Sequence, residues 1–199
     1  MPSVVIFDLG GVLIEWSPRH LYRKLFDDEA EMERFLAEVT PLEWNEEMDA
    51  GRPWADGIAE RVALFPHEAE RIRAYRDRWP EMLGPINQAT VQIMEDLVAR
   101  NVPLYALTNW AADTFEYVKD YPFFQHFEGI LVSGREGLKK PDPAIYRLLL
   151  DRYGLTAEAC AFIDDSHRNI VAAEQLGIHG IHFTSAEQAR RELVALGLL

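Results

Sequence analysis

Five short apolar runs, spread along the whole chain, constrain its fold more than any other feature of the sequence. Each run is rich in Val, Ile, Leu or Phe and shows no alternation with polar residues. Strands that are covered on both faces have this pattern, because neither side of such a strand meets water. The runs comprise residues 4–7, 104–107, 130–133, 161–163 and 180–183. The sequence therefore predicts five buried strands.

Between these runs, apolar residues recur at the spacing of amphipathic helices. The pattern is present in residues 89–100, 143–153, 169–176 and 185–196, and Pro143 suits the first turn of the second helix. Strands that alternate with helices favour a parallel sheet with helices on both faces. We therefore expect an α/β fold with a Rossmann-like, doubly wound parallel sheet.

One long segment breaks this alternation. Residues 17–84 contain no convincing strand but several amphipathic helical stretches, such as 31–39 and 54–64. A crossover between parallel strands needs only about a dozen residues, so this segment is far longer than a connection requires. We expect it to form a small α-helical cap, inserted into an α/β core domain that consists of residues 1–16 and 85–199.

Charge and hydropathy exclude several classes of protein. The chain carries 33 acidic and 20 basic residues, a net charge of −13, which disfavours nucleic acid and anionic membranes as partners. No uninterrupted apolar run approaches the ~18 residues that a membrane span requires. The first residues lack the basic start of a signal peptide. We expect a cytoplasmic protein that acts on a small molecule, and the sequence leaves a homodimer open.

Polar residues gather directly after the predicted strands. They are Asp8 after the first run, Thr108 and Asn109 after the second, Lys140 beyond the third, and Asp164, Asp165 and Asn169 after the fourth. In an open α/β sheet, ligands bind outside the carboxyl ends of the strands. Carboxylates, a hydroxyl, an amide and a lysine are therefore expected to converge at one edge of the sheet.

The segments FDLGG, LTN, KKPDP and IDDSHRN, in this order, resemble the four motifs of the haloacid dehalogenase (HAD) superfamily of hydrolases. The likeness runs from Val4 to about Phe183, and the helical insertion lies where that superfamily carries its cap. The chain is most similar to the phosphatase branch with a small helical cap, close to bacterial sugar-phosphate (glucose-1-phosphate) phosphatases that share the DLG start. The resemblance implies a Mg²⁺-dependent phosphomonoesterase that acts on a small phosphorylated metabolite, with a sugar phosphate favoured, through an aspartyl-phosphate intermediate.

The same resemblance assigns the nucleophile and the metal site. Asp8 would attack phosphorus, and a carboxylate is able to form such an acyl phosphate. Mg²⁺ would be held by Asp8, by the Gly10 carbonyl and by the adjacent acids Asp164 and Asp165, of which Asp165 occupies the family's direct-ligand position. Asn169 would support the metal waters or the lysine. This assignment agrees with simple electrostatics, because clustered carboxylates repel one another without a cation and Mg²⁺ prefers oxygen ligands.

Three further residues are assigned to the phosphoryl group by resemblance. The Thr108 hydroxyl and the Asn109 backbone amide would bind it, and Lys140 would neutralise charge on the nucleophile and the phosphoryl oxygens. Clamping of this kind is what phosphoryl transfer chiefly demands. The neighbouring Lys139 is expected to be exposed.

The organic part of the substrate is expected between the cap and the core. Trp44 and Asn45 in the cap and Trp110 after the second strand are the candidates, because aromatic faces and amides suit a sugar ring and its hydroxyls. Both tryptophans could instead pack inside the protein, which is common for large aromatic side chains.

One position departs from the family pattern. Most phosphatases of this family carry a second aspartate two residues after the nucleophile, as general acid and base, and here that residue is Gly10. Such a group contributes about 10²–10⁴-fold in rate. The enzyme could be weak or inactive, a cap residue could replace the acid, or the leaving group could need little protonation, which is the explanation we favour. The candidate replacements are Glu15, His20, Glu46, Glu47 and Asp49.

Two other functions compete with the phosphatase. A 2-haloacid dehalogenase also uses an aspartate nucleophile without a second aspartate, but it needs no metal, and Asp164 and Asp165 would make such a site too negative for an anionic substrate. A non-catalytic binding protein with the same fold would bind Mg²⁺ and a phosphate mimic without turnover.

Overall fold

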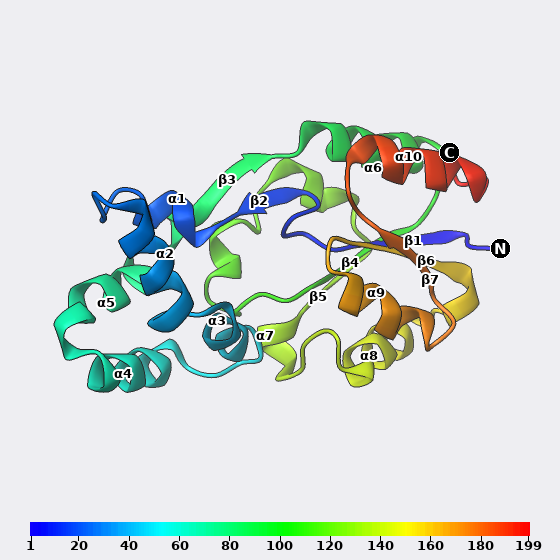
Figure 1. Ribbon diagram of the computed structural model, residues 1–199. Coiled ribbons are helices and arrows are strands. Elements are labelled where there is room, and N and C mark those ends of the chain that lie inside the picture. Colours follow the sequence, from blue (N-terminus) through cyan, green and yellow to red (C-terminus); the bar gives the residue numbers. More distant parts are fainter.

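A parallel sheet of five strands forms the centre of the computed structural model, which describes all residues from Met1 to Leu199 (Figure 1). The strand order is β5-β4-β1-β6-β7, and all neighbouring pairs are parallel. The strands are β1 (Val4–Phe7), β4 (Leu104–Thr108), β5 (Gly129–Val132), β6 (Cys160–Asp164) and β7 (His179–His182). Each predicted run corresponds to one of these strands, and the α/β fold with a parallel sheet is confirmed.

Helices cover both faces of this sheet. They are α6 (Gln88–Ala99), α7 (Ser133–Glu136), α8 (Pro143–Tyr153), α9 (His167–Glu174) and α10 (Ala186–Ala195). Helices α6 and α10 lie on one face, and α8 and α9 lie on the other (Figure 1). Because side chains alternate along a strand, Val5 and Phe7 of β1 pack in the layer of α6, whereas Val4 and Ile6 pack in the layer of α8. No helix in the structure combines the length and the apolar character needed to cross a bilayer.

Local signals in the sequence set the ends of α8. The Asp142 side chain accepts a hydrogen bond from the backbone N–H of Ala144, and Pro143 stands in the first turn, where its missing N–H costs nothing. Gly154 ends the helix in the left-handed conformation, with φ of 64°. The observed range is therefore the predicted one. Helix α9 begins at His167, two residues before the predicted start at Asn169.

The insertion forms a helical layer beside the sheet (Figure 1). Its helices are α1 (Pro18–Tyr22), α2 (Glu29–Glu38), α3 (Leu42–Asp49), α4 (Trp54–Leu64) and α5 (Ala69–Asp77). They are held together by aromatic side chains, and the ring of Trp44 lies 5.1 Å from that of Tyr75 and 5.7 Å from that of Trp54. Aromatic pairs at such distances add stability beyond their buried area. A 3₁₀ turn at Pro66–Glu68 connects α4 to α5, and another at Trp79–Met82 connects α5 to the strand that follows.

The structure corrects the prediction that the insertion contains no strand. Strand β3 (Leu83–Ile86) begins inside it and pairs antiparallel with β2 (Ile14–Trp16), so a two-stranded ribbon joins the cap to the core. Both strands are too short to show a periodic pattern, and the second contains Gly84 and Pro85, which are uncommon inside strands. The main hydrophobic cluster runs through cap and core without interruption. The division of the chain at residues 16 and 84 stays a prediction.

The prediction that the run at 180–183 is covered on both faces is wrong. The corresponding strand β7 is one of the two edge strands of the sheet, and His179 and His182 on it are exposed. Only Ile181 is fully buried in this strand. The presence of His182 in the predicted run agrees with this exposure.

Candidate active site

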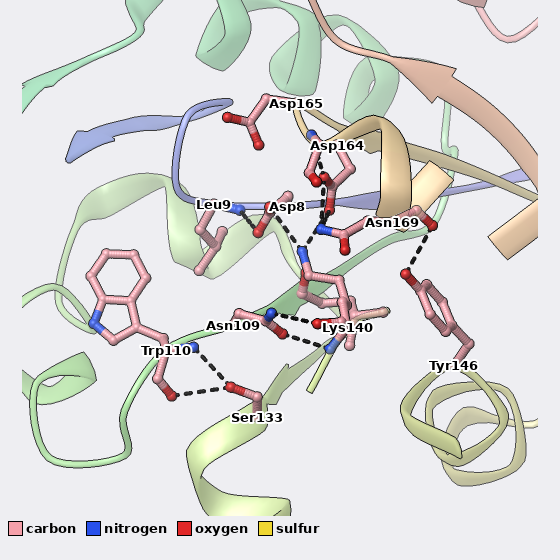
Figure 2. Close-up of polar contacts among 12 residues, drawn as sticks. Asp8, Leu9, Asn109, Trp110, Ser133, Lys140, Tyr146, Asp164, Asp165 and Asn169 are labelled. Atoms are coloured by element: carbon pink, nitrogen blue, oxygen red, sulfur yellow. Dashed lines mark hydrogen bonds and ion pairs between the residues drawn. The ribbon is translucent and has the colours of Figure 1, made fainter. Parts of the chain in front are cut away.

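Three neighbouring strands deliver acidic and hydroxyl groups to one point. Strands β4, β1 and β6 lie side by side in the middle of the sheet and run in the same direction. Their carboxyl ends carry Thr108, Asp8 and Asp164, and Figure 2 shows Asp8 and Asp164 facing the amine of Lys140. The convergence follows from the topology, because parallel strands end at the same edge.

Lys140 lies at the centre of this cluster and is completely buried. Its Nζ lies 2.8 Å from Asp8 Oδ2 and 2.6 Å from Asp164 Oδ2, and it also donates to the Leu107 carbonyl at 3.0 Å. All three hydrogens of the ammonium group thus have an acceptor. Burial alone would lower the pKa of Lys140, but Asp164 and Asp8 raise it, so the amine stays charged.

Asp8 is a buried carboxylate held in one orientation. Its Oδ1 accepts a hydrogen bond of 2.7 Å from the backbone N–H of Leu9, while its other oxygen faces Lys140. Burial raises the pKa of Asp8 well above its usual value, and Asp164 and Asp165 raise it further, whereas Lys140 lowers it. The site therefore contains more negative charge than Lys140 balances.

The side chain of Asp164 is fully occupied by contacts within the protein. Besides Lys140, its oxygens accept hydrogen bonds from the backbone N–H of Ser166 at 2.8 Å and from Asn169 Nδ2 at 3.0 and 3.1 Å. Asn169 is in turn fixed through its backbone carbonyl, which accepts a hydrogen bond of 2.9 Å from the Tyr146 hydroxyl (Figure 2). Asp164 thus orients Lys140.

Asp165, in contrast, is exposed and its carboxylate has no side-chain partner. Although the residue reaches solvent, its carboxyl group is partly desolvated by the surrounding protein, and this desolvation and the neighbouring Asp164 raise its pKa. The backbone at Gly11 passes close to it: Gly11 has φ of 73°, and a Cβ there would lie 2.2 Å from Asp165 Oδ2. Oxygens of Asp8, Asp164 and Asp165 lie within 4.8 Å of one another. This donor set, all oxygen and under-neutralised, fits a hard divalent cation such as Mg²⁺.

Thr108 and Asn109 occupy the end of β4. The Thr108 hydroxyl is buried and has no hydrogen-bond partner in the protein, so it is available to an anionic group beside Asp8. The Asn109 side chain exchanges two hydrogen bonds with the backbone of Lys140, 2.9 Å to its carbonyl and 2.8 Å from its N–H. This pair fixes the Lys140 backbone to the sheet, a role that the sequence analysis did not foresee.

A pocket of about 160 Å³ opens between the cap and this site. Its lining comprises Gly10, Trp16, Leu42, Asn45, Glu46, Asp49, Trp79, Asn109, Trp110 and Arg168. Asn45 and Trp110, both predicted to contact the organic part of a substrate, thus line this pocket. Trp44 is not: its ring is buried in the cap and its indole N–H donates to the Gly57 carbonyl at 3.2 Å, so the prediction that Trp44 contacts the substrate is wrong.

The comparisons agree with this architecture. A family model described as haloacid dehalogenase-like hydrolase matches residues 2–177. The chain belongs to this family. It is therefore a hydrolase, and the resemblance to the HAD superfamily is confirmed.

The relatives of this HAD-like hydrolase include phosphatases. Sesquiterpene phosphatase astK of Aspergillus oryzae is 26% identical over 96% of this chain and 94% of its own length. A phosphorylated carbohydrates phosphatase of Thermotoga maritima is 23% identical over 90% of this chain and 84% of its own. Among solved structures, a HAD family enzyme of Bacteroides thetaiotaomicron in complex with magnesium and inorganic phosphate has a TM-score of 0.66 at 22% identity, covering 91% of this chain and 93% of that one.

The HAD-like hydrolase also contains contacts between cap and core that sequence analysis missed. Glu46 of α3 pairs with Lys139 at 2.5 Å and with Arg168, so Lys139 is less free than expected. The Ser133 hydroxyl donates to the Asp49 carbonyl at 2.5 Å and accepts from the Trp110 N–H at 2.8 Å. These contacts hold the cap over the site. Arg168 lies within the IDDSHRN motif, but nothing in the sequence indicated its partner.

Proposed function

We propose that this HAD-like hydrolase is a Mg²⁺-dependent phosphomonoesterase that uses Asp8 as its nucleophile. The observation that carries this proposal is the cluster of three acids, Asp8, Asp164 and Asp165, whose oxygens lie within 4.8 Å of one another while a single buried lysine pairs with the first two. A metal-free reaction with an anionic substrate is disfavoured by this excess of negative charge. If the site takes up a divalent cation before it binds a phosphate ester, the negative charges of the acids and of the substrate are balanced.

The metal would be held by Asp8, by the Gly10 carbonyl and by Asp165. Asp165 is the better direct ligand of the two adjacent acids, because its carboxylate is exposed and unpartnered whereas the Asp164 oxygens are engaged by Lys140, Ser166 and Asn169. When bound, the ion would neutralise charge on the nucleophile and on the phosphoryl oxygens.

The protein groups account for the steps of the reaction. The carboxylate of Asp8, held by the Leu9 N–H, attacks phosphorus and gives an aspartyl-phosphate as the alcohol leaves. The Thr108 hydroxyl, the Asn109 backbone amide and Lys140 bind the oxygens of the phosphoryl group in both half-reactions. Water then attacks phosphorus, and the bond to Asp8 breaks. Because Asn109 fixes the backbone of Lys140, the groups that bind the phosphoryl oxygens do not need to reorganise during the reaction.

The pocket supports a ring-sized organic group. A cavity of ~150 Å³ holds a benzene-sized ring, and the pocket here has about 160 Å³. Trp16, Trp79 and Trp110 contribute aromatic rings to the lining, while Asn45 and Asp49 contribute groups that are able to form hydrogen bonds. An aromatic lining with a few polar groups suits a sugar ring, so we favour a sugar phosphate, in keeping with the phosphorylated carbohydrates phosphatase among the relatives.

A terpenoid alkyl phosphate is the second candidate. Leu42, an apolar residue with 55% of its surface exposed, stands at the pocket beside the tryptophans and would extend an apolar wall. Sesquiterpene phosphatase astK is the relative that points to the same class.

The proposal is tested by hydrolysis of phosphate esters with Mg²⁺ and with EDTA. The panel contains sugar phosphates, including anomeric ones, and farnesyl phosphate, with 2-chloropropionate alongside for chloride release. We expect phosphate release that EDTA abolishes and that Asp8→Asn lacks, while Asp8→Asn still binds a phosphate mimic. Chloride release that is insensitive to EDTA would assign the protein to the dehalogenases. Mg²⁺ binding without any turnover would favour a binding protein.

A further inference from the structure

We propose that Asp49, at the end of cap helix α3, is the general acid and base of this hydrolase and takes the role that Gly10 cannot perform. This inference rests on the proposed phosphatase function and adds a catalytic residue to it. Asp49 would give a proton to the leaving oxygen of the substrate and later take one from the attacking water.

Asp49 lines the pocket on the cap side, opposite Gly10 and Asn109 of the core. A substrate whose phosphoryl group lies at Asp8 must place its leaving group in this pocket, because the pocket adjoins the phosphoryl site at Gly10 and Asn109. Asp49 is therefore placed beside the space that the leaving group would occupy, whereas Asp8 belongs to the phosphoryl site of the core.

Two contacts hold Asp49 in this place. Its Oδ2 accepts a hydrogen bond of 3.0 Å from Asn45 Nδ2, one turn earlier on α3. Its backbone carbonyl accepts the hydroxyl of Ser133, which is itself fixed by the N–H of Trp110 on the core. The backbone of Asp49 is thus tied to the core even though the residue belongs to the cap.

The other acids near the cap are unsuited to proton transfer. Burial alone would raise the pKa of Glu46, but its hydrogen bonds to Lys139 and Arg168 lower it, so Glu46 stays ionised. Glu15 is exposed and is paired with His20 at 2.9 Å. Glu47 is exposed, pairs with Arg52 and does not line the pocket. Among the candidate replacements, Asp49 alone combines access to the pocket with the absence of a cationic partner.

The surroundings of Asp49 suit a group that both gives and takes a proton. Burial raises the pKa of Asp49 to about 7, although a hydrogen bond from the Ala111 backbone N–H acts in the opposite direction and lowers it. The titratable groups that face it are Glu46 from its own helix, Lys139 and Lys140 from the core, and the phenol of Tyr75. Catalytic acids and bases work best when their pKa is near the operating pH.

The proton balance is complete without another reactant. In the first step Asp8 bonds to phosphorus, the bond from phosphorus to the leaving oxygen breaks, and Asp49 protonates that oxygen to release a neutral alcohol. In the second step the Asp49 carboxylate takes a proton from water, the water oxygen bonds to phosphorus, and the bond to Asp8 breaks. Phosphate leaves, and the starting state, in which Asp8 is ionised and Asp49 is protonated, is restored.

The test compares two aryl phosphates of nearly equal shape. Phenyl phosphate needs protonation of its leaving oxygen, whereas p-nitrophenyl phosphate releases a stable anion. Under single-turnover conditions with Mg²⁺, we expect Asp49→Asn to slow release of phenol by about 10²–10⁴-fold and release of p-nitrophenol by about tenfold or less. The matched control is Glu43→Gln, an exposed acid on the same helix, which should keep wild-type rates.

The wild-type protein provides a second readout that needs no variant. Release of phenol should fall as the pH rises past about 7, and release of p-nitrophenol should not. Equal rates for wild type and Asp49→Asn on phenyl phosphate, or the same pH dependence for both esters, would overturn the role of Asp49 while leaving the phosphatase intact. If the wild type hydrolyses neither these esters nor the metabolite panel, the proposed function itself has failed.

Discussion

Replacement of Lys140 by methionine tests the charge cluster through the stability of the fold. Methionine has a similar length and no charge, so Lys140→Met leaves Asp8 and Asp164 buried without their cation. Removing one partner of a buried ion pair costs about 3–5 kcal/mol. For a chain of this size, 1 kcal/mol corresponds to roughly 2–4 °C in Tm, so the midpoint should fall by about 6–20 °C.

Urea unfolding at pH 8 without metal measures this loss directly. Lys139→Met is the matched control, because Lys139 is partly exposed and its partner Glu46 keeps Arg168; its cost should be about 1 kcal/mol or less. The loss in free energy of unfolding caused by Lys140→Met should become smaller as the pH is lowered toward 5. Without the lysine, the folded-state pKa of Asp8, which is already above its unfolded value, rises further, so the variant loses more stability than the wild type as pH rises. A loss no larger than that of Lys139→Met would refute the account of the cluster.

Three further predictions concern the metal, the cap and the acid. Asp165→Asn should weaken Mg²⁺ binding by at least about tenfold in a calorimetric titration, and unchanged affinity would exclude Asp165 as a ligand. Glu46→Gln, which breaks the pairs with Lys139 and Arg168, should raise KM severalfold in steady-state kinetics with little change in kcat; an unchanged KM would show that these pairs do not close the cap. Asp49 contributes stability that is present below pH 3.8 and lost as pH rises through its folded pKa of about 7, because the folded state disfavours its charged form. Asp49→Asn should therefore gain in Tm over wild type between pH 5 and pH 8, and parallel curves would contradict the raised pKa.

The sheet and the positions of its polar residues were predictable from sequence for a topological reason. Residues that follow buried parallel strands meet at one edge, so Asp8, Thr108 and Asp164 come together whatever the details of packing. Lys140 lies farther from a strand, and its assignment depended on resemblance. That Lys140 is buried between two acids could be seen only in the structure, because hydrophobic patterns in the sequence do not show where a loop packs back against the sheet.

The cap was less predictable because neighbouring residues on a helix point in different directions. The sequence predicts that the neighbours Trp44 and Asn45 both contact the substrate. On α3, Asn45 and Asp49 lie one turn apart and face the pocket, whereas Trp44 and Met48 point into the cap. Which face meets the core depends on the tilt of the helix, and that tilt is set by tertiary contacts such as the one between Ser133 and Asp49.

Trapping the phosphoenzyme tests the central proposal most directly. Protein and Mg²⁺ are mixed with ³²P-labelled substrate, quenched in acid during turnover and digested, and the labelled peptide is sequenced. We expect label on the peptide that contains Asp8, and no label with EDTA or in Asp8→Asn. Phosphate release without any labelled protein, or label on another residue, would contradict Asp8 as the nucleophile.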